Sequence, residues 1–416
     1  MTVEEAERYL LSLELFGMRF GLDRMRRLMT ALDHPERRFD SIHVVGTNGK
    51  SSTVRMIAAI LAADGLRTGS YLSPHLVSFT ERIRTDDEDL DPAAFGAAVA
   101  RAARAAELVD RSLAGDDRVT QFEALTAAAY SELARQDVEV AVIEAGLGGR
   151  YDATNVIPSR VQVLTSVGLE HTRWLGPTID DIAGEKLDVV QPGATLVLGS
   201  GLHPDAARRA RAVASERGAR IVQAPADPGQ VELGALGEFQ RRNFALALAA
   251  AKAYLGAASL DPAAVASAAR DVRVPGRLQI VGESPLTLLD GAHNPDGIAA
   301  LAESMPAITA SHDPVIAVVS ILDDKDAAGM LARLMPVCDA TVFTSSQNPR
   351  ALPPPTLQSL SRQLHGPPSE IVPTPREAVA RARELAGADG IVIATGSIYL
   401  VADLLAPAGS RRASML

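Results

Sequence analysis

Short runs of β-branched and aliphatic residues alternate with alanine-rich stretches along most of the chain. In the first part of the sequence the apolar runs predict strands at residues 41–45, 138–144, 160–166, 195–198 and 221–223. The stretches between these runs have the length and composition of helices. Strands that alternate with helices are typical of α/β layers around a mainly parallel sheet. The pattern therefore predicts an α/β fold.

The same alternation restarts in the last third of the chain, after a break at residues 274–277. A helix centred on residues 243–255 precedes the break. Four further strands are expected, at residues 286–289, 315–319, 340–344 and 391–394. We expect two domains, residues 1–280 and residues 281–416, of which the second is a smaller Rossmann-like α/β unit. Residues 407–416 are expected to form a loose tail.

Composition narrows the classes of function that this fold could serve. The chain has 416 residues, of which 47% are hydrophobic and 22% charged, a formal net charge of −10 and one cysteine, Cys338. A chain of this length favours two domains with a cleft between them. The negative charge disfavours binding to nucleic acid, because a phosphate backbone needs a basic surface. A single cysteine allows no intrachain disulfide, and we expect Cys338 to be a small buried apolar residue.

No segment is expected to cross a membrane or to direct export. The first residues are acidic, and Thr2 and Glu5 have the spacing of a capping box at a helix start, unlike a signal peptide. The most apolar long stretch, residues 244–260, is alanine-rich and interrupted by Lys252, which favours a packed helix. We therefore expect a cytoplasmic protein, and a monomer by default because no interface helix stands out.

The run IHVVGTNGKSSTVRMIAAIL, residues 42–61, has the pattern of a strand, a glycine turn and a helix in succession. In that context the backbone amides and the helix N-terminus face an anion, Lys50 reaches phosphates, and Ser51 can hold Mg²⁺. The GxxGKS spacing lacks the first glycine of the longer Walker pattern, where Val44 stands. A tight turn with an incidental lysine is the alternative. The strand and helix on either side favour a nucleoside triphosphate site at residues 46–51.

Two further segments place polar residues after predicted strands, where ligands of open α/β sheets bind. Glu144 ends one strand and is followed by glycines, so its carboxylate can take a hard cation. His171 follows the next strand, and Lys186 stands on the helix after it. Taken alone, each has a plain alternative: a strand-end glutamate in solvent, a hydrogen-bonded structural histidine and a solvated helix charge.

A fourth segment, PGRLQIVGESPLTLLDGAHNPDG, spans the predicted boundary between the domains. Arg277 lies in the connecting segment, and Asp290 and His293 follow the strand that we expect to be the first of the second domain. Charged residues in these positions would face a cleft. For any one of these three residues, the alternative is a position in a linker or in a turn built on glycine, asparagine and proline. This alternative is weaker for all three together.

Together these segments resemble the folylpolyglutamate synthase and dihydrofolate synthase family, a branch of the Mur ligase superfamily. The match runs from GLDRM at residues 21–25 almost to the end of the chain. Its pieces here are GTNGKSST, YLSPHLVSFTERIR, QFEALTAAAY, EAGLGGRYDATN, GLEHTRWLG, IAGEK, FQRRNFALALAA, PGR, LLDGAHNP, DDKD, NPRAL and ATGSIYLV. The resemblance implies a P-loop-containing, Mur-ligase-like ATP-binding domain followed by the smaller Rossmann-like domain.

The resemblance also implies an ATP-driven amide ligation. ATP phosphorylates a carboxylate of a pteroate or folate substrate, and the amino group of L-glutamate attacks the acyl phosphate. The phosphate supplies the leaving group that a free carboxylate lacks, while the protein positions the reactants and neutralises charge. The leading hypothesis is a bifunctional dihydrofolate synthase and folylpolyglutamate synthase. The alternatives are a folylpolyglutamate synthase alone, another Mur-type peptide ligase, or a nucleotide-binding regulator that has lost the chemistry.

Individual roles follow from the matched motifs. The implied ATP-binding residues are Gly46, Thr47, Asn48, Gly49, Lys50, Ser51, Ser52, Asn243, Arg277, Asp290 and His293. The implied folate-binding residues are Thr120, Gln121, Phe122, Glu123, Tyr151, Asp152 and Ala153, with Phe122 either a stacking face for the pterin ring or a core aromatic. The implied catalytic residues are Lys50, His171 and Lys186.

Magnesium and a modified lysine complete what the resemblance implies. It points to two Mg²⁺ ions, with Ser51, Ser73, Glu144, His171 and a carbamylated Lys186 as ligands. Carbamylation converts the lysine cation into an anion that can help to hold metal. A lysine with the ordinary pKa of about 10.4 is neutral in only about one molecule in a few thousand at pH 7, and nearby Mg²⁺ would favour the neutral amine and its carbamate.

The chain departs from the family pattern at a few positions. Ser51 stands where a glycine commonly follows the loop lysine, and Glu170 stands where an aspartate usually precedes the histidine. Leu187 and Asp188 replace a small pair after Lys186. Gln121 and Tyr151 alter the presumed pterin wall, so the preferred form of folate is left open.

Overall fold

The structure is a computed structural model, and it describes residues 1–14, 21–115, 117–256, 260–310 and 312–407. Within these ranges the chain forms two compact units. The first comprises Met1–Glu232 and Arg242–Val272, and the second comprises Leu233–Arg241 and, among the described residues, 273–407. Both units are α/β, as the sequence predicts, and each has its own sheet and hydrophobic core.

An eight-stranded sheet in the order β4-β3-β2-β5-β1-β6-β7-β8 forms the centre of the first unit. Its strands are β1 (Asp40–Val45), β2 (Thr68–Tyr71), β3 (Ile83–Thr85), β4 (Glu88–Asp89), β5 (Val140–Glu144), β6 (Val161–Leu164), β7 (Thr195–Leu198) and β8 (Arg220–Gln223). β3 and β4 are antiparallel extensions at one edge, and the other neighbours pair in parallel. Because β1 lies between β5 and β6, the loop after β1 leaves the middle of the sheet.

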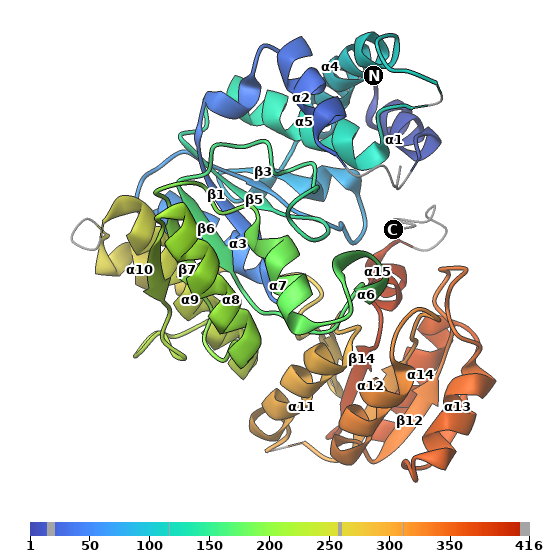
Figure 1. Ribbon diagram of the computed structural model, residues 1–416. Helices are drawn as coiled ribbons and strands as arrows, with labels where there is room; N and C mark the ends of the chain where they lie inside the picture. The colour runs from blue at the N-terminus through green and yellow to red at the C-terminus, as the bar shows by residue number, and fades with distance from the viewer. Residues whose placement is uncertain (15–20, 116, 257–259, 311, 408–416) are drawn as a thin grey trace. The chain divides into compact units, whose positions relative to one another are not determined.

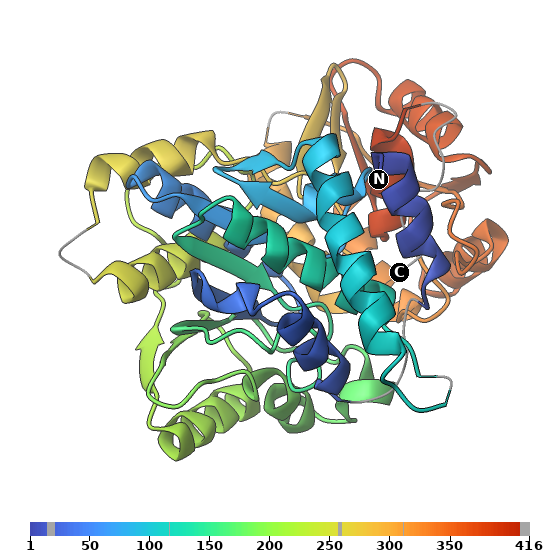
Figure 2. The same cartoon turned by 90° about the horizontal axis from the view of Figure 1, so that it is seen from above.

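Helices cover both faces of this sheet. They are α1 (Val3–Ser12), α2 (Asp23–Ala31), η1 (Pro35–Arg37), α3 (Lys50–Ala63), η2 (Phe79–Arg82), α4 (Pro92–Asp110), α5 (Gln121–Arg135), α6 (Thr172–Leu175), α7 (Ile179–Leu187), α8 (Pro204–Arg217), α9 (Glu238–Leu255) and α10 (Pro262–Asp271), where η marks a 3-10 helix. Figures 1 and 2 show α2, α4 and α5 layered on one side of β1, β3 and β5, with α3 on the other. The apolar faces of α1, α2, α4 and α5 share one core with Ala141 and Ile143 of β5.

Short-range sequence signals set where several of these helices begin. Thr2 and Glu5 form the capping box that the sequence predicts, with reciprocal side-chain and backbone hydrogen bonds. Thr120 and Glu123 form a second capping box at the start of α5. α4 and α10 each start with a proline after an aspartate cap, a combination that satisfies free backbone donors. α5 therefore begins directly after Thr120, within a segment predicted to bind substrate.

The second unit is built on a six-stranded sheet in the order β13-β12-β11-β14-β10-β9. Its strands are β9 (Gln279–Glu283), β10 (Leu286–Leu289), β11 (Val315–Val319), β12 (Ala340–Phe343), β13 (Ser369–Ile371) and β14 (Ile391–Thr395). Its helices are α11 (Pro295–Thr309), α12 (Ala327–Leu334), η3 (Met335–Val337), α13 (Pro354–Gln363), α14 (Pro375–Ala386) and α15 (Ile398–Leu405). All neighbouring strands are parallel except β9, which pairs with β10 in antiparallel fashion at the edge.

The nine strands predicted from the sequence are all present, with ends that differ by at most two residues. The strand at Leu286–Leu289 is not the first of its unit, because β9 precedes it. Ile280 and Val281 of β9 are exposed, so β9 lacks the buried apolar run by which most of the other strands were predicted. The predicted helix at residues 243–255 begins earlier, at Glu238. The boundary after residue 280 stays a prediction.

Some predictions fall partly on residues beyond the described ranges. Residues 408–416 of the predicted tail and residues 257–259 of the most apolar stretch are among them. Cys338 is half-buried, and burial raises the pKa of its thiol to about 12. Throughout the described stretches of the chain, every helix is too short or too polar to span a lipid bilayer.

Candidate active site

The loop between β1 and α3 requires glycine at both of its ends. Gly46 has φ 154° and Gly49 has φ 84°, backbone conformations that residues with a Cβ adopt only with strain. A Cβ on Gly46 would overlap Oγ1 of Thr165, and a Cβ on Gly49 would lie 2.6 Å from Oδ1 of Asn243. Asn243 on α9 therefore packs against the loop, so the structure brings this predicted ATP-binding residue to the glycine turn.

The end of β6 holds the loop from the side. The backbone N–H of Thr47 donates to the carbonyl of Ser166 at 2.9 Å, and that of Asn48 donates to Oγ of Ser166 at 2.9 Å. Oγ1 of Thr165 donates to the carbonyl of Asn48 at 2.7 Å. Thr165 and Ser166 are not among the site residues predicted from the sequence. Their place at the end of the strand next to β1 is the signal that could have identified them, because the carboxyl ends of parallel neighbours lie together.

The N-terminus of α3 is open to a ligand. Gly49 caps it without a side-chain hydrogen bond, so the first backbone N–H groups of the helix have no capping side chain. The Lys50 side chain turns back over the loop, and its Nζ donates to the carbonyls of Gly46 and Thr47 at 3.1 and 3.2 Å. Ser52 is buried in the first turn. Backbone amides, a helix dipole and an amine thus meet at one place, which suits a phosphate group.

Glu144 connects the loop to the neighbouring strands. Its carboxylate is buried at the end of β5, Oε1 accepts from Oγ of Ser51 at 2.9 Å, and Oε2 accepts from the backbone N–H of Ser73 at 3.1 Å. The structure therefore brings together three of the residues predicted to hold magnesium. Carboxylate and hydroxyl oxygens are ligands that Mg²⁺ prefers.

Lys186 lies in the same region and has an altered acidity. Its side chain is only 5% exposed on α7, and Nζ donates to the carbonyl of Gly46 at 2.9 Å. Burial, and then the positive charge of Lys50, lower the pKa of Lys186 to about 7, against the opposing influence of Glu170 and Asp152. The alternative of a solvated helix charge is therefore wrong for this residue.

His171 takes a less enclosed position. It caps α6 in a left-handed conformation with φ 53°, and its side chain is 40% exposed. Nε2 lies 4.0 Å from Oε1 of Glu170. Over the described ranges, histidine, cysteine, aspartate and glutamate side chains do not gather in threes in a metal-binding arrangement. The role of His171 as a magnesium ligand stays a prediction.

Several residues predicted to bind folate make structural contacts. Thr120 and Glu123 cap α5, and Glu123 also accepts two hydrogen bonds from buried Arg24 at 3.0 and 3.1 Å. Gln121 is buried, and its Nε2 donates to the carbonyl of Leu10 at 2.8 Å. These contacts occupy the side chains of all three, and their contact with substrate stays a prediction.

The two aromatic residues of the predicted pterin wall differ in exposure. Phe122 packs against Gly146, where a Cβ would come within 2.6 Å of its ring, and its ring centroid lies 6.1 Å from that of Tyr71. It is partly buried against the core, which agrees with the core-aromatic alternative, while its role as a stacking face for the pterin ring stays a prediction. Tyr151 is 46% exposed, whereas Asp152 and Ala153 are buried.

The three charged residues predicted in the second unit lie close together. The carboxylate of Asp290 accepts from the backbone N–H of Leu278 at 2.9 Å and of Ala292 at 2.8 Å, and burial raises its pKa against the opposing charge of Arg277. Nδ1 of His293 is 2.9 Å from the carbonyl of Gly291. A Cβ on Gly291 would overlap Nη1 of Arg277, so the guanidinium group rests on this glycine.

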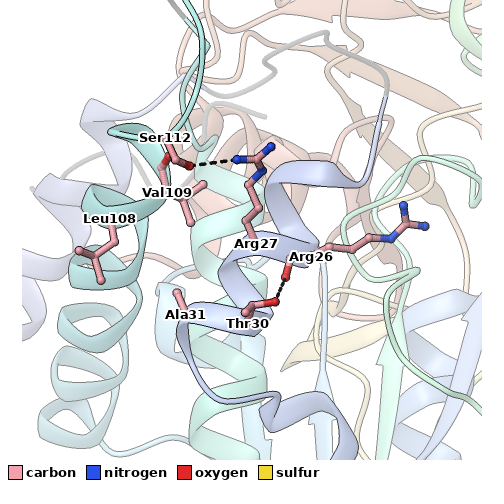
Figure 3. A pocket seen from close by; sticks show the side chains of 7 residues that line it. All are labelled: Arg26, Arg27, Thr30, Ala31, Leu108, Val109 and Ser112. Atoms are coloured by element: carbon pink, nitrogen blue, oxygen red, sulfur yellow. Dashed lines mark hydrogen bonds between the residues drawn. The ribbon is translucent and has the colours of Figure 1, made fainter.

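A cavity of about 340 Å³ lies elsewhere in the first unit, between α2 and α4 (Figure 3). It is lined by Arg26, Arg27, Thr30, Ala31, Leu108, Val109 and Ser112. Arg27 already donates to Asp23 and to Ser112, at 2.8 and 3.1 Å. The lining includes none of the predicted site residues, so we assign the candidate site to the loop after β1 and not to this hollow.

Comparisons with known proteins agree with the chemistry of this site. Residues 276–398 match the family described as Mur ligase, glutamate ligase domain. The chain is 36% identical to the dihydrofolate synthase/folylpolyglutamate synthase of Mycobacterium tuberculosis over 383 residues, which cover 83% of this chain and 78% of that protein. Its structure resembles M. tuberculosis folylpolyglutamate synthase complexed with ADP, with a TM-score of 0.89 and 32% identity over 97% of both chains. Escherichia coli FolC in complex with DHPP and ADP matches with a TM-score of 0.85 and 30% identity, over 97% of both chains.

Proposed function

Because the chain belongs to the dihydrofolate synthase/folylpolyglutamate synthase family of ATP-dependent ligases, we propose that it attaches L-glutamate to dihydropteroate, to a tetrahydrofolate or its polyglutamate, or to both. The observation that carries this proposal is the cluster at the carboxyl edge of the first sheet. There the open N-terminus of α3, Lys50, buried Glu144 and buried Lys186 meet at one loop. A nucleotide-binding regulator would need the loop and Lys50 but would not need Glu144 or Lys186.

The loop and its lysine act on the phosphate groups of ATP. The backbone amides of residues 46–51 and the N-terminus of α3 bind the phosphates, and Lys50 neutralises the charge that develops as the terminal phosphoryl group moves. The bond from that phosphorus to ADP breaks while a bond to the substrate carboxylate forms. The amino group of L-glutamate then attacks the acyl carbon, and phosphate leaves.

Magnesium fits the donor set at Ser51 and Glu144. Their oxygens are 2.9 Å apart beside the loop, and both are hard ligands. We assign Ser51 to a magnesium ion on the phosphates, and Ser73, Glu144, His171 and Lys186 to the second ion that the family resemblance implies. When bound, the metal neutralises phosphate charge and polarises the transferred group.

The acidity of Lys186 favours its carbamylation. With a pKa of about 7, about half of the Lys186 side chains are neutral at pH 7, compared with about one in a few thousand for an ordinary lysine. Only the neutral amine reacts with carbon dioxide. Carbamylation would replace a buried cation next to Lys50 by an anion, which reverses an unfavourable interaction.

Release of ADP tests the proposed function. Purified protein is incubated with Mg²⁺ and ATP, with L-glutamate plus dihydropteroate in one set and L-glutamate plus tetrahydrofolate in another. We expect ADP release in both sets, and none when glutamate is omitted. Release only with tetrahydrofolate would indicate a folylpolyglutamate synthase without dihydrofolate synthase activity. Release with neither acceptor would overturn the proposal and favour a regulator.

A labelling experiment tests the carbamate separately. In protein equilibrated with ¹³C-bicarbonate we expect one carbamate resonance that is absent from Lys186→Ala. That variant should lose turnover and regain part of it with added short-chain carboxylates. Full activity of Lys186→Ala without such additions would disprove a role for the modification. The cytoplasmic location and the monomeric state expected from the sequence stay predictions.

A further inference from the structure

A buried histidine stands directly beneath the nucleotide loop, outside the machinery described so far. His43 lies on β1, three residues before Gly46, and pairs in register with Ile143 of β5 and Gln162 of β6. Its side chain is fully buried, and burial lowers the pKa of the imidazole to about 3. A charged role in catalysis is therefore excluded for it at neutral pH.

The imidazole of His43 has a specific partner far away in the sequence. Its Nε2 lies 2.8 Å from Oγ1 of Thr154, and the same hydroxyl contacts Oδ1 of Asp152. A carboxylate oxygen can only accept, so the hydroxyl of Thr154 donates to Asp152 and must accept from His43. Nε2 of His43 consequently carries the proton. Nδ1, for which no hydrogen-bond partner is found among the described residues, is then a bare acceptor and not a buried N–H.

The Asp152 carboxylate, which accepts from the Thr154 hydroxyl, also binds the backbone at both ends of a loop. Its Oδ2 accepts from the backbone N–H of Leu147 at 2.8 Å, and its Oδ1 accepts from that of Thr154 at 3.0 Å. The carboxylate thus joins the two ends of residues 147–154. Tyr130 of α5 adds a hydrogen bond from its hydroxyl to the carbonyl of Thr154 at 3.0 Å.

The loop closed by Asp152 borders the candidate site on two sides. It begins next to Gly146, on which Phe122 packs. At Gly149 it approaches the carbonyls of Glu185 and Lys186 so closely that a Cβ would lie 2.8 and 2.7 Å from their oxygens. The loop also carries Tyr151, the exposed aromatic residue of the predicted pterin wall.

We propose that His43 is a positioning residue, whose imidazole acts through Thr154 to orient Asp152 and so fixes residues 147–154 as a wall for the folate substrate. The link to substrate rests on the proposed function, whereas the link to the loop rests on the hydrogen bonds alone. In this order of donors, from His43 to Thr154 to Asp152, the Asp152 carboxylate accepts the hydrogen bonds that hold the loop.

Hydrogen–deuterium exchange of the substrate-free protein tests the link to the loop. In Thr154→Val, which keeps the shape but removes the hydroxyl, we expect backbone amides of residues 147–154 to exchange about tenfold faster, the factor for loss of one buried hydrogen bond. Thr154→Ser should restore slow exchange. His43→Leu should resemble the valine variant, and His43→Gln, whose amide can donate in place of Nε2, should resemble the wild type. Unchanged exchange in both Thr154→Val and His43→Leu would overturn the inference, whether or not the protein is a ligase.

Steady-state kinetics of the same variants test the link to substrate. We expect Thr154→Val and His43→Leu to raise the KM for the folate substrate about tenfold while the KM for ATP changes less than twofold, with recovery in Thr154→Ser and His43→Gln. Ser41→Ala, a buried polar position on the same strand, is the control and should match the wild type. Faster loop exchange with an unchanged folate KM would overturn the positioning role. Failure of the wild type to release ADP at all would instead count against the proposed function.

Discussion

Each unit has a turn that joins a parallel strand to a helix at the carboxyl edge of its sheet, and the two turns end differently. Residues 46–49 lead from β1 into α3, whose N-terminus has Gly49 as its cap and no side-chain hydrogen bond there. Residues 290–294 lead from β10 into α11, where Oδ1 of Asn294 accepts from the backbone N–H of Gly297 at 2.8 Å and Pro295 takes the first helical position. One helix end is open and the other is closed.

The open and the closed helix end differ in the hydrogen-bond donors that they offer to an anion. An open helix end offers backbone N–H groups and the positive end of the helix dipole, which suit phosphate of any nucleotide. A closed end offers fewer free N–H groups, since the asparagine accepts from one amide and the proline has none to donate. The ATP contacts predicted for Arg277 and His293 in the second unit are therefore side-chain contacts, and they stay predictions.

The largest effect is expected at the open end. Lys50→Ala removes the amine that bends over the loop, and we expect kcat to fall about 1000-fold because charge on the moving phosphoryl group is left without its cation. ADP release at saturating substrates measures this loss. Lys252→Ala, the same change at an exposed position of α9, is the matched control and should be neutral. A Lys50→Ala enzyme within tenfold of the wild type would mean that the open end does not hold the reacting phosphates.

Most of the strands that the sequence predicts correctly are buried apolar runs, and the exposed edge strand β8 is the exception. β5, β11 and β14 read as unbroken apolar runs because helices cover both sides of the sheet. β3, β4, β9 and β13 were missed because they are short or leave side chains exposed, so neither a run nor a clean alternation marks them. β2 was missed although it is buried, because its residues TGSY do not form an apolar run. Short strands and strands of polar residues therefore carry less sequence signal than long apolar runs, whether they lie at an edge or inside the sheet.

The site was predictable as far as strand ends and glycine turns define it. The loop at residues 46–51 and Glu144 follow from position alone, because β1 and β5 are parallel neighbours. Contacts between distant segments carry no such signal. Gln121 is held by the carbonyl of Leu10, and His43 meets Thr154, 111 residues apart in each case. A role for Gln121 in folate binding therefore came from resemblance, while its observed hydrogen bond joins α5 to α1.

A smaller effect is expected in the turn of the second unit. Gly291→Ala places a methyl group where the guanidinium of Arg277 rests, and the side chain must move away. We expect the KM for ATP to rise about tenfold, the range for loss of one charged hydrogen bond, with kcat within threefold. Arg277→Ala should do the same. The double variant should be no worse than Arg277→Ala, because both changes remove one interaction. Additive losses would show that the glycine acts independently of Arg277.

The smallest effect is expected at the closed helix end. Asn294→Ala removes a side-chain cap, which should lower the free energy of unfolding of the second unit by about 1 kcal/mol, measured by urea denaturation. The KM for ATP should stay within twofold, because an amide that was bonded to Asn294 is not a ligand for phosphate. Asn294→Asp keeps an acceptor and is the control. A rise in the KM for ATP above tenfold in Asn294→Ala at unchanged stability would show that the end of α11 takes part in binding the anion, and the distinction between an open and a closed turn would fail.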